Sequence, residues 1–342
     1  MSEPLNLTTL VETVNGGRTL SAGEMEFALE QMTEGALPPA EMGTFLLKLR
    51  ERGETVDEVT GAARLLRSRM TPVEAPEGTI DIVGTGGDGH HTYNVSTCAV
   101  FVAAGAGARV AKHGNRSVSS LSGASDVLAA LGVKLDVPPA TISRAIEEAG
   151  VGFMWAPMHH PAMKVWAPIR AELGVRTMFN VLGPISNPAR VKRQVVGVFE
   201  RRWLVPLANV LMNLGSEHAW IVHGHDGMDE LSTTGPTTVA ELKDGTVRVF
   251  DITPEDFDLP RATLADLKGG DATVNAAALR QVLDGHRGPY RDIVLLNAAA
   301  ALVVGGQAND LHDGLFLANE AIANGDALAA LEGLIRITNT TD

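Results

Sequence analysis

Two glycine-rich loops constrain the fold of this chain more than any other feature. The first, Gly84–Asp88 (GTGGD), follows the apolar segment 80–83 and precedes an expected helix over 96–106. The second, Lys112–Arg116 (KHGNR), follows another short apolar segment and precedes an expected helix over 125–131. A loop between a strand and a helix presents backbone N–H groups and a helix N-terminus to an anion. The pattern therefore predicts a site for a multiply charged anion.

The first loop is a weak signal on its own, because a tight turn explains Gly84–Asp88 equally well. It is not a P-loop, since no Gly-Lys-Ser/Thr triplet ends it, and its glycine spacing does not fit a dinucleotide fingerprint. The second loop is denser in anion donors, because Lys112–Arg116 is followed by Ser119 and Ser120. A solvated basic turn would not need paired serines. Together the two loops favour phosphate binding.

Hydrophobic periodicity divides the chain into two unlike parts. Residues 1–70 show only helical patterns, and a linker with two prolines and a glycine follows at 71–79. Beyond it, short apolar strands alternate with helices, which is typical of a largely parallel sheet. We therefore expect an α/β fold. A small all-helical domain would join a large α/β domain, in which helices flank a mostly parallel central sheet.

Local signals predict where several elements begin and end. Capping boxes, each with a glutamate three residues later, predict helices that start after Ser21 and Thr55. The pair Asp244-Gly245 between two apolar segments predicts a β-hairpin. Residues 176–189 contain one glycine and two prolines and are expected to form a loop.

The charge balance limits the partners. The chain has 28 Lys and Arg against 41 Asp and Glu, a net charge of −13, which argues against nucleic acid. The local patch of Lys112, His113 and Arg116 still permits a small phosphate ligand. A single cysteine, Cys98, excludes an internal disulfide. Without a signal-peptide pattern or an apolar stretch of about 20 residues, we expect a cytoplasmic protein with no membrane partner.

Adjacent carboxylates at Asp229-Glu230 follow an expected strand. They offer the hard oxygen ligands that Mg²⁺ prefers, although an ordinary charged loop is the commoner reason for such a pair. Ser96 and Thr97, at the start of an expected helix, fit either helix caps or hydroxyl ligands to a phosphate or to magnesium.

Two further polar features are ambiguous or negative. His159-His160 does not predict a zinc site, because adjacent histidines do not converge on one ion and no third ligand has suitable spacing. Arg170 lies in a helix expected over 161–173. It is either a solvated or salt-bridged residue or a bidentate clamp on a carboxylate.

Six motifs in this order resemble those of the anthranilate phosphoribosyltransferases of tryptophan biosynthesis. They extend the two loops, and the resemblance covers the chain from about Leu5 to Ile335. Pyrimidine nucleoside phosphorylases, which share the architecture, resemble the chain less, because their second loop lacks Asn-Arg. The motifs are Gly84–Asp88, Asn94–Thr97, Lys112–Ser120, Met158–Pro161, Asn180–Pro188 and Asp229-Glu230.

This resemblance implies a reaction and an architecture. The phosphoribosyl group of 5-phosphoribosyl 1-pyrophosphate would move to the amine of anthranilate, giving N-(5-phosphoribosyl)anthranilate and pyrophosphate. Two Mg²⁺ ions per monomer and a homodimer formed through the helical domains are implied as well. The helical domain would comprise residues 1–72 with a middle segment near 168–180. Residues 73–167 and 181–342 would form the α/β domain.

The resemblance also implies roles for individual residues. Anthranilate would contact Gly84, Asn115 and Arg170, in a tunnel lined by His113 and His160. Ser96 would ligate one Mg²⁺, and Asp229 with Glu230 the other, Glu230 reaching both. Phosphoribosyl pyrophosphate would contact Gly84, Gly87, Asp88, Thr92, Asn94, Val95, Ser96, Thr97, Lys112, His113, Gly114, Asn115, Arg116, Ser117, Val118, Ser119, Ser120 and Ala124.

No acid or base is assigned, because an aromatic amine is already unprotonated at pH 7. The chain departs from the family pattern at Tyr93 and His90-His91, beside the first loop, which puts the mobility of that loop in doubt.

Two alternatives remain. A nucleoside phosphorylase would bind inorganic phosphate and a nucleobase, whereas a metal site at Asp229-Glu230 suits pyrophosphate. A binding protein of the same fold would keep the loops without turnover.

Overall fold

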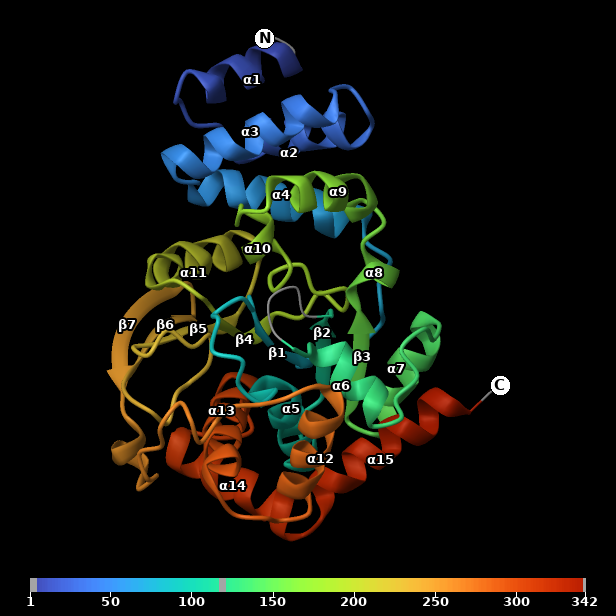
Figure 1. Cartoon of the computed structure of the whole chain (residues 1–342), viewed down its shortest axis with the longest axis vertical. Coiled ribbons are helices and arrows are strands. Elements are labelled where there is room, and N and C mark those ends of the chain that lie inside the picture. The colour runs from blue at the N-terminus through green and yellow to red at the C-terminus, as the bar shows by residue number, and fades with distance from the viewer. Residues whose placement is uncertain (1–4, 117–120, 341–342) are drawn as a thin grey trace.

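The computed structural model describes residues 5–116 and 121–340. Within them, one seven-stranded sheet lies between two helical layers (Figure 1). The strands are β1 (Ile80–Gly84), β2 (Val110–Gly114), β3 (Val151–Trp155), β4 (Arg193–Gly197), β5 (His218–Gly224), β6 (Thr237–Lys243) and β7 (Thr246–Ile252). The α-helices are α1 (Leu7–Asn15), α2 (Ala22–Thr33), α3 (Pro39–Arg52), α4 (Val56–Arg69), α5 (Val95–Gly105), α6 (Ala124–Ala130), α7 (Pro139–Glu148), α8 (Ala156–His159), α9 (Met163–Leu173), α10 (Phe179–Leu182), α11 (Leu204–Asn213), α12 (Ala272–Leu283), α13 (Pro289–Gly305), α14 (Leu311–Ala323) and α15 (Asp326–Asn339), with 3₁₀ turns η1 (Arg201–Trp203) and η2 (Pro254–Phe257).

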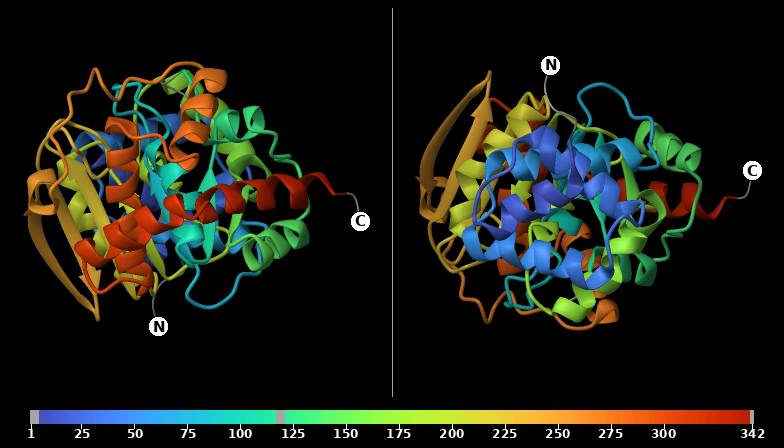
Figure 2. Two further views of the ribbon diagram at one scale, coloured as in Figure 1. Left: turned by 90° about the horizontal axis from the view of Figure 1, so that it is seen from below. Right: turned by 90° about the horizontal axis from the view of Figure 1, so that it is seen from above.

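The N-terminal helices form where the capping signals place them. Ser21 caps α2 and Thr55 caps α4, and both reciprocal capping boxes are present. Helix α9 packs against this group, because its Trp166 is buried and donates a hydrogen bond from Nε1 to Thr33 Oγ1 at 3.0 Å. Figure 1 shows α1–α4 and α9 together above the sheet, and the right view of Figure 2 shows them from above. The helical domain is confirmed.

The strand order is β3-β2-β1-β4-β5-β6-β7. The first five strands in this order are parallel, and β6 and β7 join as antiparallel strands at one edge. Asp244 and Gly245 connect β6 to β7 with φ values of 50° and 72°. Two positive φ values match the type I′ turn of a tight hairpin, so the hairpin prediction is confirmed. The mostly parallel central sheet is confirmed as well.

Alternate side chains of each strand enter different cores, as the two-residue period of a strand requires. Ile82 and Val195 pack with α5, α13 and α15 on one face. Val83 and Val196 face the other way, into a core shared by the helical domain, α10 and α11. This second core joins the helical domain to the sheet without a break.

One expectation was wrong in detail. Residues 176–189 contain the short helix α10, whose Phe179, Val181 and Leu182 are buried in the core beneath the helical domain. Strand β4 ends at Gly197, because its pairing with β1 ends at Gly84. Helix α15 was not predicted, and it packs beside α5 and α7.

The sheet reverses its order at β1, which lies between β2 and β4. In open parallel sheets, ligands bind at the carboxyl ends of the strands where the order reverses. Both glycine-rich loops leave these ends.

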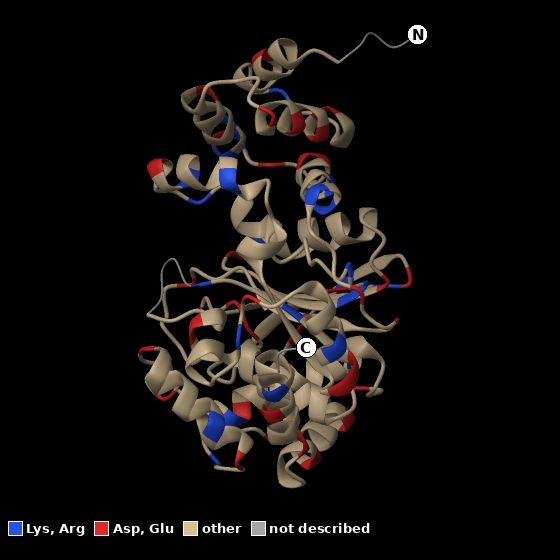
Figure 3. Cartoon of the chain, turned by 90° about the vertical axis from the view of Figure 1, so that its right-hand side faces the viewer, with Lys and Arg blue, Asp and Glu red and all other residues tan. Residues whose placement is uncertain are grey.

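No described helix is long and apolar enough to cross a membrane. Figure 3 shows Lys and Arg interspersed with Asp and Glu over both domains.

Candidate active site

The loop after β1 is held on three sides. Thr85 donates from its N–H to Gly197 O at 3.0 Å, and its hydroxyl oxygen accepts from Phe199 N at 3.1 Å. Gly86 donates from its N–H to Asp229 Oδ2 at 2.6 Å, and the carbonyl of Gly87 accepts a hydrogen bond from Arg176, which follows α9. Gly86 and Gly87 have φ values of 66° and 77°, which favour glycine. Contacts with residues far away in the sequence therefore fix the conformation of this loop.

Asp229 reaches this loop because two glycines leave it room. It lies after β5, against the ends of β1 and β4, and a Cβ at Gly84 or Gly197 would collide with it. Only glycine permits so close an approach of the backbone. Asp229 is therefore fixed beside the first loop, although more than 140 residues separate them in the sequence.

Ser96, Glu230 and Lys112 meet at the N-terminus of α5. Ser96 donates from its backbone N–H to Glu230 Oε1 at 3.1 Å. The buried Lys112 donates from Nζ to Ile82 O at 2.6 Å and to Ser96 Oγ at 3.3 Å. One cation, two carboxylates and the start of a helix thus converge at the ends of β1 and β2.

The charged forms of the side chains in this cluster are disfavoured by burial, and those of the two carboxylates also by repulsion from neighbouring carboxylates. Burial raises the pKa of Asp229, and the neighbouring Asp88 raises it further. Burial and then repulsion from Asp229 raise the pKa of Glu230. Burial lowers the pKa of Lys112, while Asp81 and both of these carboxylates oppose the change. A divalent cation would relieve the repulsion between the two carboxylates.

The residues fit Mg²⁺ rather than a metal held entirely by protein. Within residues 5–116 and 121–340, no group of three His, Cys, Asp or Glu side chains is arranged to hold a metal ion. Mg²⁺ usually takes one or two carboxylates and completes its shell with water and substrate phosphates. Asp229, Glu230 and the Ser96 hydroxyl match that requirement.

The structure describes the second loop on both sides of residues 117–120. Asn115 and Arg116 are exposed, and Asn115 Oδ1 accepts from Arg116 N at 2.8 Å. Asp126 Oδ2 accepts from Gly123 N at 2.9 Å where α6 begins at Ala124. The predicted contacts Ser117, Val118, Ser119 and Ser120 lie outside the described residues.

Asn275, on α12, joins the two loops, and the sequence analysis missed it. Its Nδ2 donates to Asn94 Oδ1 and to Ser122 Oγ, both at 2.9 Å, and its Oδ1 accepts from Gly270 N at 2.7 Å. The predicted contact Thr92 forms an isolated β-bridge with Lys268 beside it. No sequence signal links these segments, because about 180 residues separate Asn94 from Asn275.

Two buried histidines face each other near the second loop. His113 Nε2 and His160 Nε2 are 3.2 Å apart, and His113 Nδ1 lies 3.2 Å from Gly183 O. A carbonyl only accepts, so His113 carries its proton on Nδ1 and accepts from His160. Burial lowers the pKa of His113 well below its usual value and that of His160 to about 4, so both are neutral at pH 7. His159 turns away from this pair, and its Nδ1 lies 2.9 Å from Thr71 O.

Asp81 is a second residue that the sequence analysis missed. It is fully buried on β1, where its two oxygens accept from His113 N at 3.4 Å and Asn187 Nδ2 at 2.7 Å. Burial raises its pKa to about 6, although Lys112 opposes this. Asp81 thus fixes the backbone of the second loop to the segment after α10.

Arg170 lies in the last turn of α9, half-buried, with its guanidinium 5.6 Å from the centre of the Phe179 ring. Burial lowers its pKa. In the described part of the chain, no ion pair or hydrogen bond of its side chain is found, and none joins it to the loops. The salt-bridge explanation of Arg170 therefore lacks support, and its fork is free for a ligand.

Comparison with known proteins identifies the family. Residues 77–328 match the glycosyl transferase family, a/b domain, and residues 8–70 match the glycosyl transferase family, helical bundle domain. Anthranilate phosphoribosyltransferase of Rhodopseudomonas palustris (strain TIE-1) is 56% identical over 334 residues, which is 98% of this chain and 99% of the relative. That of Parvibaculum lavamentivorans is 57% identical over 331 residues, 97% of both.

Solved structures give the same result. The Thermus thermophilus anthranilate phosphoribosyltransferase matches with a TM-score of 0.92 and 41% identity, over 97% of this chain and 99% of that one. The Saccharomyces cerevisiae enzyme in complex with PRPP and Mg matches with a TM-score of 0.89 and 29% identity, over 98% of both chains. By sequence and by fold, this chain belongs to the anthranilate phosphoribosyltransferase family.

Proposed function

We propose that the cluster at the carboxyl ends of β1 and β2 carries out the reaction of this family. The phosphoribosyl group of 5-phosphoribosyl 1-pyrophosphate is transferred to the amine of anthranilate, with release of pyrophosphate, in tryptophan biosynthesis. The observation that supports this assignment best is the convergence of Lys112, Ser96, Asp229 and Glu230 beside the Gly84–Asp88 loop.

The phosphates of the donor bind the two loops and the start of α5. The pyrophosphate end contacts Gly84, Gly87, Asp88, Thr92 and the Asn94–Thr97 segment. The remaining contacts come from Lys112 through Ser120 and from Ala124. Backbone N–H groups of such loops suit a polyanion because they cost no reorganisation when charge develops. Lys112, buried between Ile82 O and Ser96 Oγ, supplies a fixed cation at the floor of the site.

Asp229, Glu230 and Ser96 would hold Mg²⁺, and we propose two ions per monomer. When bound, magnesium neutralises charge on the leaving pyrophosphate. The S. cerevisiae structure with PRPP and Mg supports the use of this metal. The protein itself contributes the fixed carboxylates, which Gly86 N and Ser96 N orient by donating hydrogen bonds to them.

Anthranilate binds between the loops and the helical domain. Arg170 holds its carboxylate in a bidentate pair, and Asn115 and Gly84 position the ring and amine toward the anomeric carbon. The neutral pair His113 and His160 lines the approach, where an uncharged wall admits an aromatic ring. The amine attacks without a general base, because it is unprotonated at pH 7. Positioning and stabilisation of the leaving group therefore supply most of the acceleration.

We also propose the division of the chain and its assembly. Residues 1–72, with a segment near 168–180, form the helical domain, since Ile169 and Leu173 of α9 pack against Gly43 of α3. Residues 73–167 and 181–342 form the α/β domain. Two chains associate through their helical domains. Sedimentation of the purified protein at micromolar concentration tests this dimer.

One assay tests the proposed function. Anthranilate fluorescence should fall when phosphoribosyl pyrophosphate and Mg²⁺ are added to the wild-type protein, and it should not fall if either is omitted. Lys112→Ala should slow the decay and raise the half-saturating concentration of phosphoribosyl pyrophosphate. Steady fluorescence with all components present would show that the chain lacks this activity.

A further inference from the structure

An arginine outside the proposed contact set reaches the first phosphate loop. Arg176 follows α9 and its left-handed terminal Gly174, in the segment that leads to α10. Its guanidinium donates a hydrogen bond to the carbonyl oxygen of Gly87. It also lies 4.2 Å from the centre of the Phe199 ring and 3.7 Å from Glu200 Oε1. One side chain thus joins the segment below the helical domain to the loop of the α/β domain.

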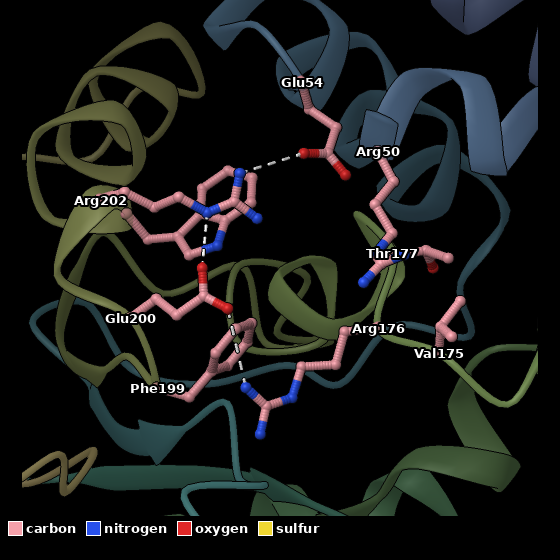
Figure 4. Close-up of a pocket in the computed structure, with 9 residues that line it drawn as sticks. Arg50, Glu54, Val175, Arg176, Thr177, Phe199, Glu200 and Arg202 are labelled. Atoms are coloured by element: carbon pink, nitrogen blue, oxygen red, sulfur yellow. Dashed lines mark hydrogen bonds and ion pairs between the residues drawn. The ribbon is translucent and has the colours of Figure 1, made fainter. Parts of the chain in front are cut away.

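The contacts of Arg176 continue toward the helical domain, as Figure 4 shows. Glu200 accepts from Arg202 Nε at 2.6 Å, and Arg202 Nη1 lies 3.8 Å from Glu54 Oε2. Glu54 follows α3, and its side chain is only 1% exposed. A row of alternating charges therefore runs from the end of α3 to Arg176 and ends at Gly87. Such a row favours one orientation of Glu200 and, through it, of Arg176.

We propose that Arg176 is a positioning residue for the phosphoribosyl pyrophosphate loop, acting through the Gly87 carbonyl. This inference rests on the proposed function of that loop. In a trans peptide, C=O and N–H point in opposite directions, so anchoring Gly87 O toward Arg176 directs the N–H of Asp88 to the opposite side. Gly86 and Gly87 both have positive φ, and without an anchor their backbone has more accessible conformations than that of other residues.

Arginine suits this place better than lysine. A planar guanidinium can stack on an aromatic ring and donate in its own plane at the same time, whereas an ammonium is a point charge without a stacking face. The side chain of Arg176 is 45% exposed and borders a cavity of about 330 Å³ lined also by Glu54, Phe199 and Glu200. Alanine or lysine therefore fits without overlap, and water can take the vacated space.

The test compares Arg176→Ala and Arg176→Lys with the wild-type enzyme, varying each substrate in the fluorescence assay. Because Arg176 is partly exposed, we expect Arg176→Ala to raise the KM for phosphoribosyl pyrophosphate about three- to tenfold. The KM for anthranilate should change less than about twofold, since the proposed anthranilate contact Arg170 lies on α9, before Gly174. Arg176→Lys should recover part of the loss. The melting temperature of each variant is measured alongside.

Two reference variants make the result decisive. Arg261→Ala removes another exposed arginine, which follows η2 and pairs with Glu255, and this variant should leave both KM values unchanged. Lys112→Ala should raise the KM for phosphoribosyl pyrophosphate if the proposed site is right. If Lys112→Ala has this effect and Arg176→Ala has none, the positioning role is wrong while the proposed function stands. If neither variant changes this KM, the assignment of the site itself fails.

A double-mutant cycle tests whether Glu200 acts through Arg176. Glu200→Gln should raise the KM for phosphoribosyl pyrophosphate in the wild-type background and add nothing to Arg176→Ala, because the group that it orients is gone. Equal effects of Glu200→Gln in both backgrounds would overturn this link. A fall in melting temperature with both KM values raised in parallel would assign Arg176 a structural role only.

Discussion

Replacing Arg170 separates two explanations of the acceptor site. The guanidinium is half-buried, lies over Phe179, and makes no ion pair within the described residues. Burial has removed part of the water around this cation, and no carboxylate pairs with it in the described protein. We therefore expect it to bind the carboxylate of anthranilate. Arg170→Ala would remove both hydrogen bonds that we propose for the fork. Arg170→Lys keeps the charge but loses the fork.

The expected magnitudes follow from these contacts. Hydrogen bonds to a charged group contribute about 1.5–3 kcal/mol, so Arg170→Ala should raise the KM for anthranilate about 10- to 150-fold. Arg170→Lys should lie between this variant and the wild type. The KM for phosphoribosyl pyrophosphate should change little. Loss of the contact with Phe179 costs about 0.5–1 kcal/mol, which lowers the melting temperature by roughly 2 °C.

Steady-state kinetics with each substrate varied, together with melting curves, measure all of these quantities. Lys164→Ala is the matched control, because Lys164 is an exposed basic residue on the same helix. It should leave both KM values at the wild-type level. An Arg170→Ala protein that melts several degrees lower but keeps the wild-type KM for anthranilate would refute the reasoning and make Arg170 a structural residue.

Further predictions concern the metal and the loops. Asp229→Asn combined with Glu230→Gln should lower turnover strongly and raise the Mg²⁺ requirement while the circular dichroism spectrum persists; an unchanged Mg²⁺ titration would contradict the assignment. Burial raises the pKa of both carboxyls, and repulsion from Asp88 on Asp229 and from Asp229 on Glu230 raises them further. Protons therefore compete with the metal, so the half-saturating Mg²⁺ concentration should fall as pH rises from about 6 to 8.5. A pH-independent requirement would count against these ligands. Lys112→Ala should weaken phosphoribosyl pyrophosphate and Asn115→Ala chiefly anthranilate, each by about 1.5–3 kcal/mol in calorimetry. Wild-type affinity for both ligands in both variants would show that this loop does not bind them.

Local signals in the sequence were sufficient for most individual elements. Ser21 and Thr55 cap helices where predicted, because a cap involves residues only three apart. Asp244-Gly245 forms the predicted turn, because both positive φ values depend on those two residues. The two glycine-rich loops could be predicted for the same reason, since the strand, the loop and the helix of each are contiguous in the sequence. The proposed ligands within those loops remain predictions.

The tertiary structure decided how separate segments meet. Asp229 reaches Gly86 across more than 140 residues, Asn275 supports Asn94 across about 180, and Arg176 reaches Gly87 across 89. Buried Asp81 gains a role only because the second loop and the segment after α10 pack against β1. Neither periodicity nor capping records which segments become neighbours, because those patterns describe residues a few positions apart. The order of the strands, with β1 between β2 and β4, brings these side chains to one edge of the sheet, and this order is a property of the whole folded chain.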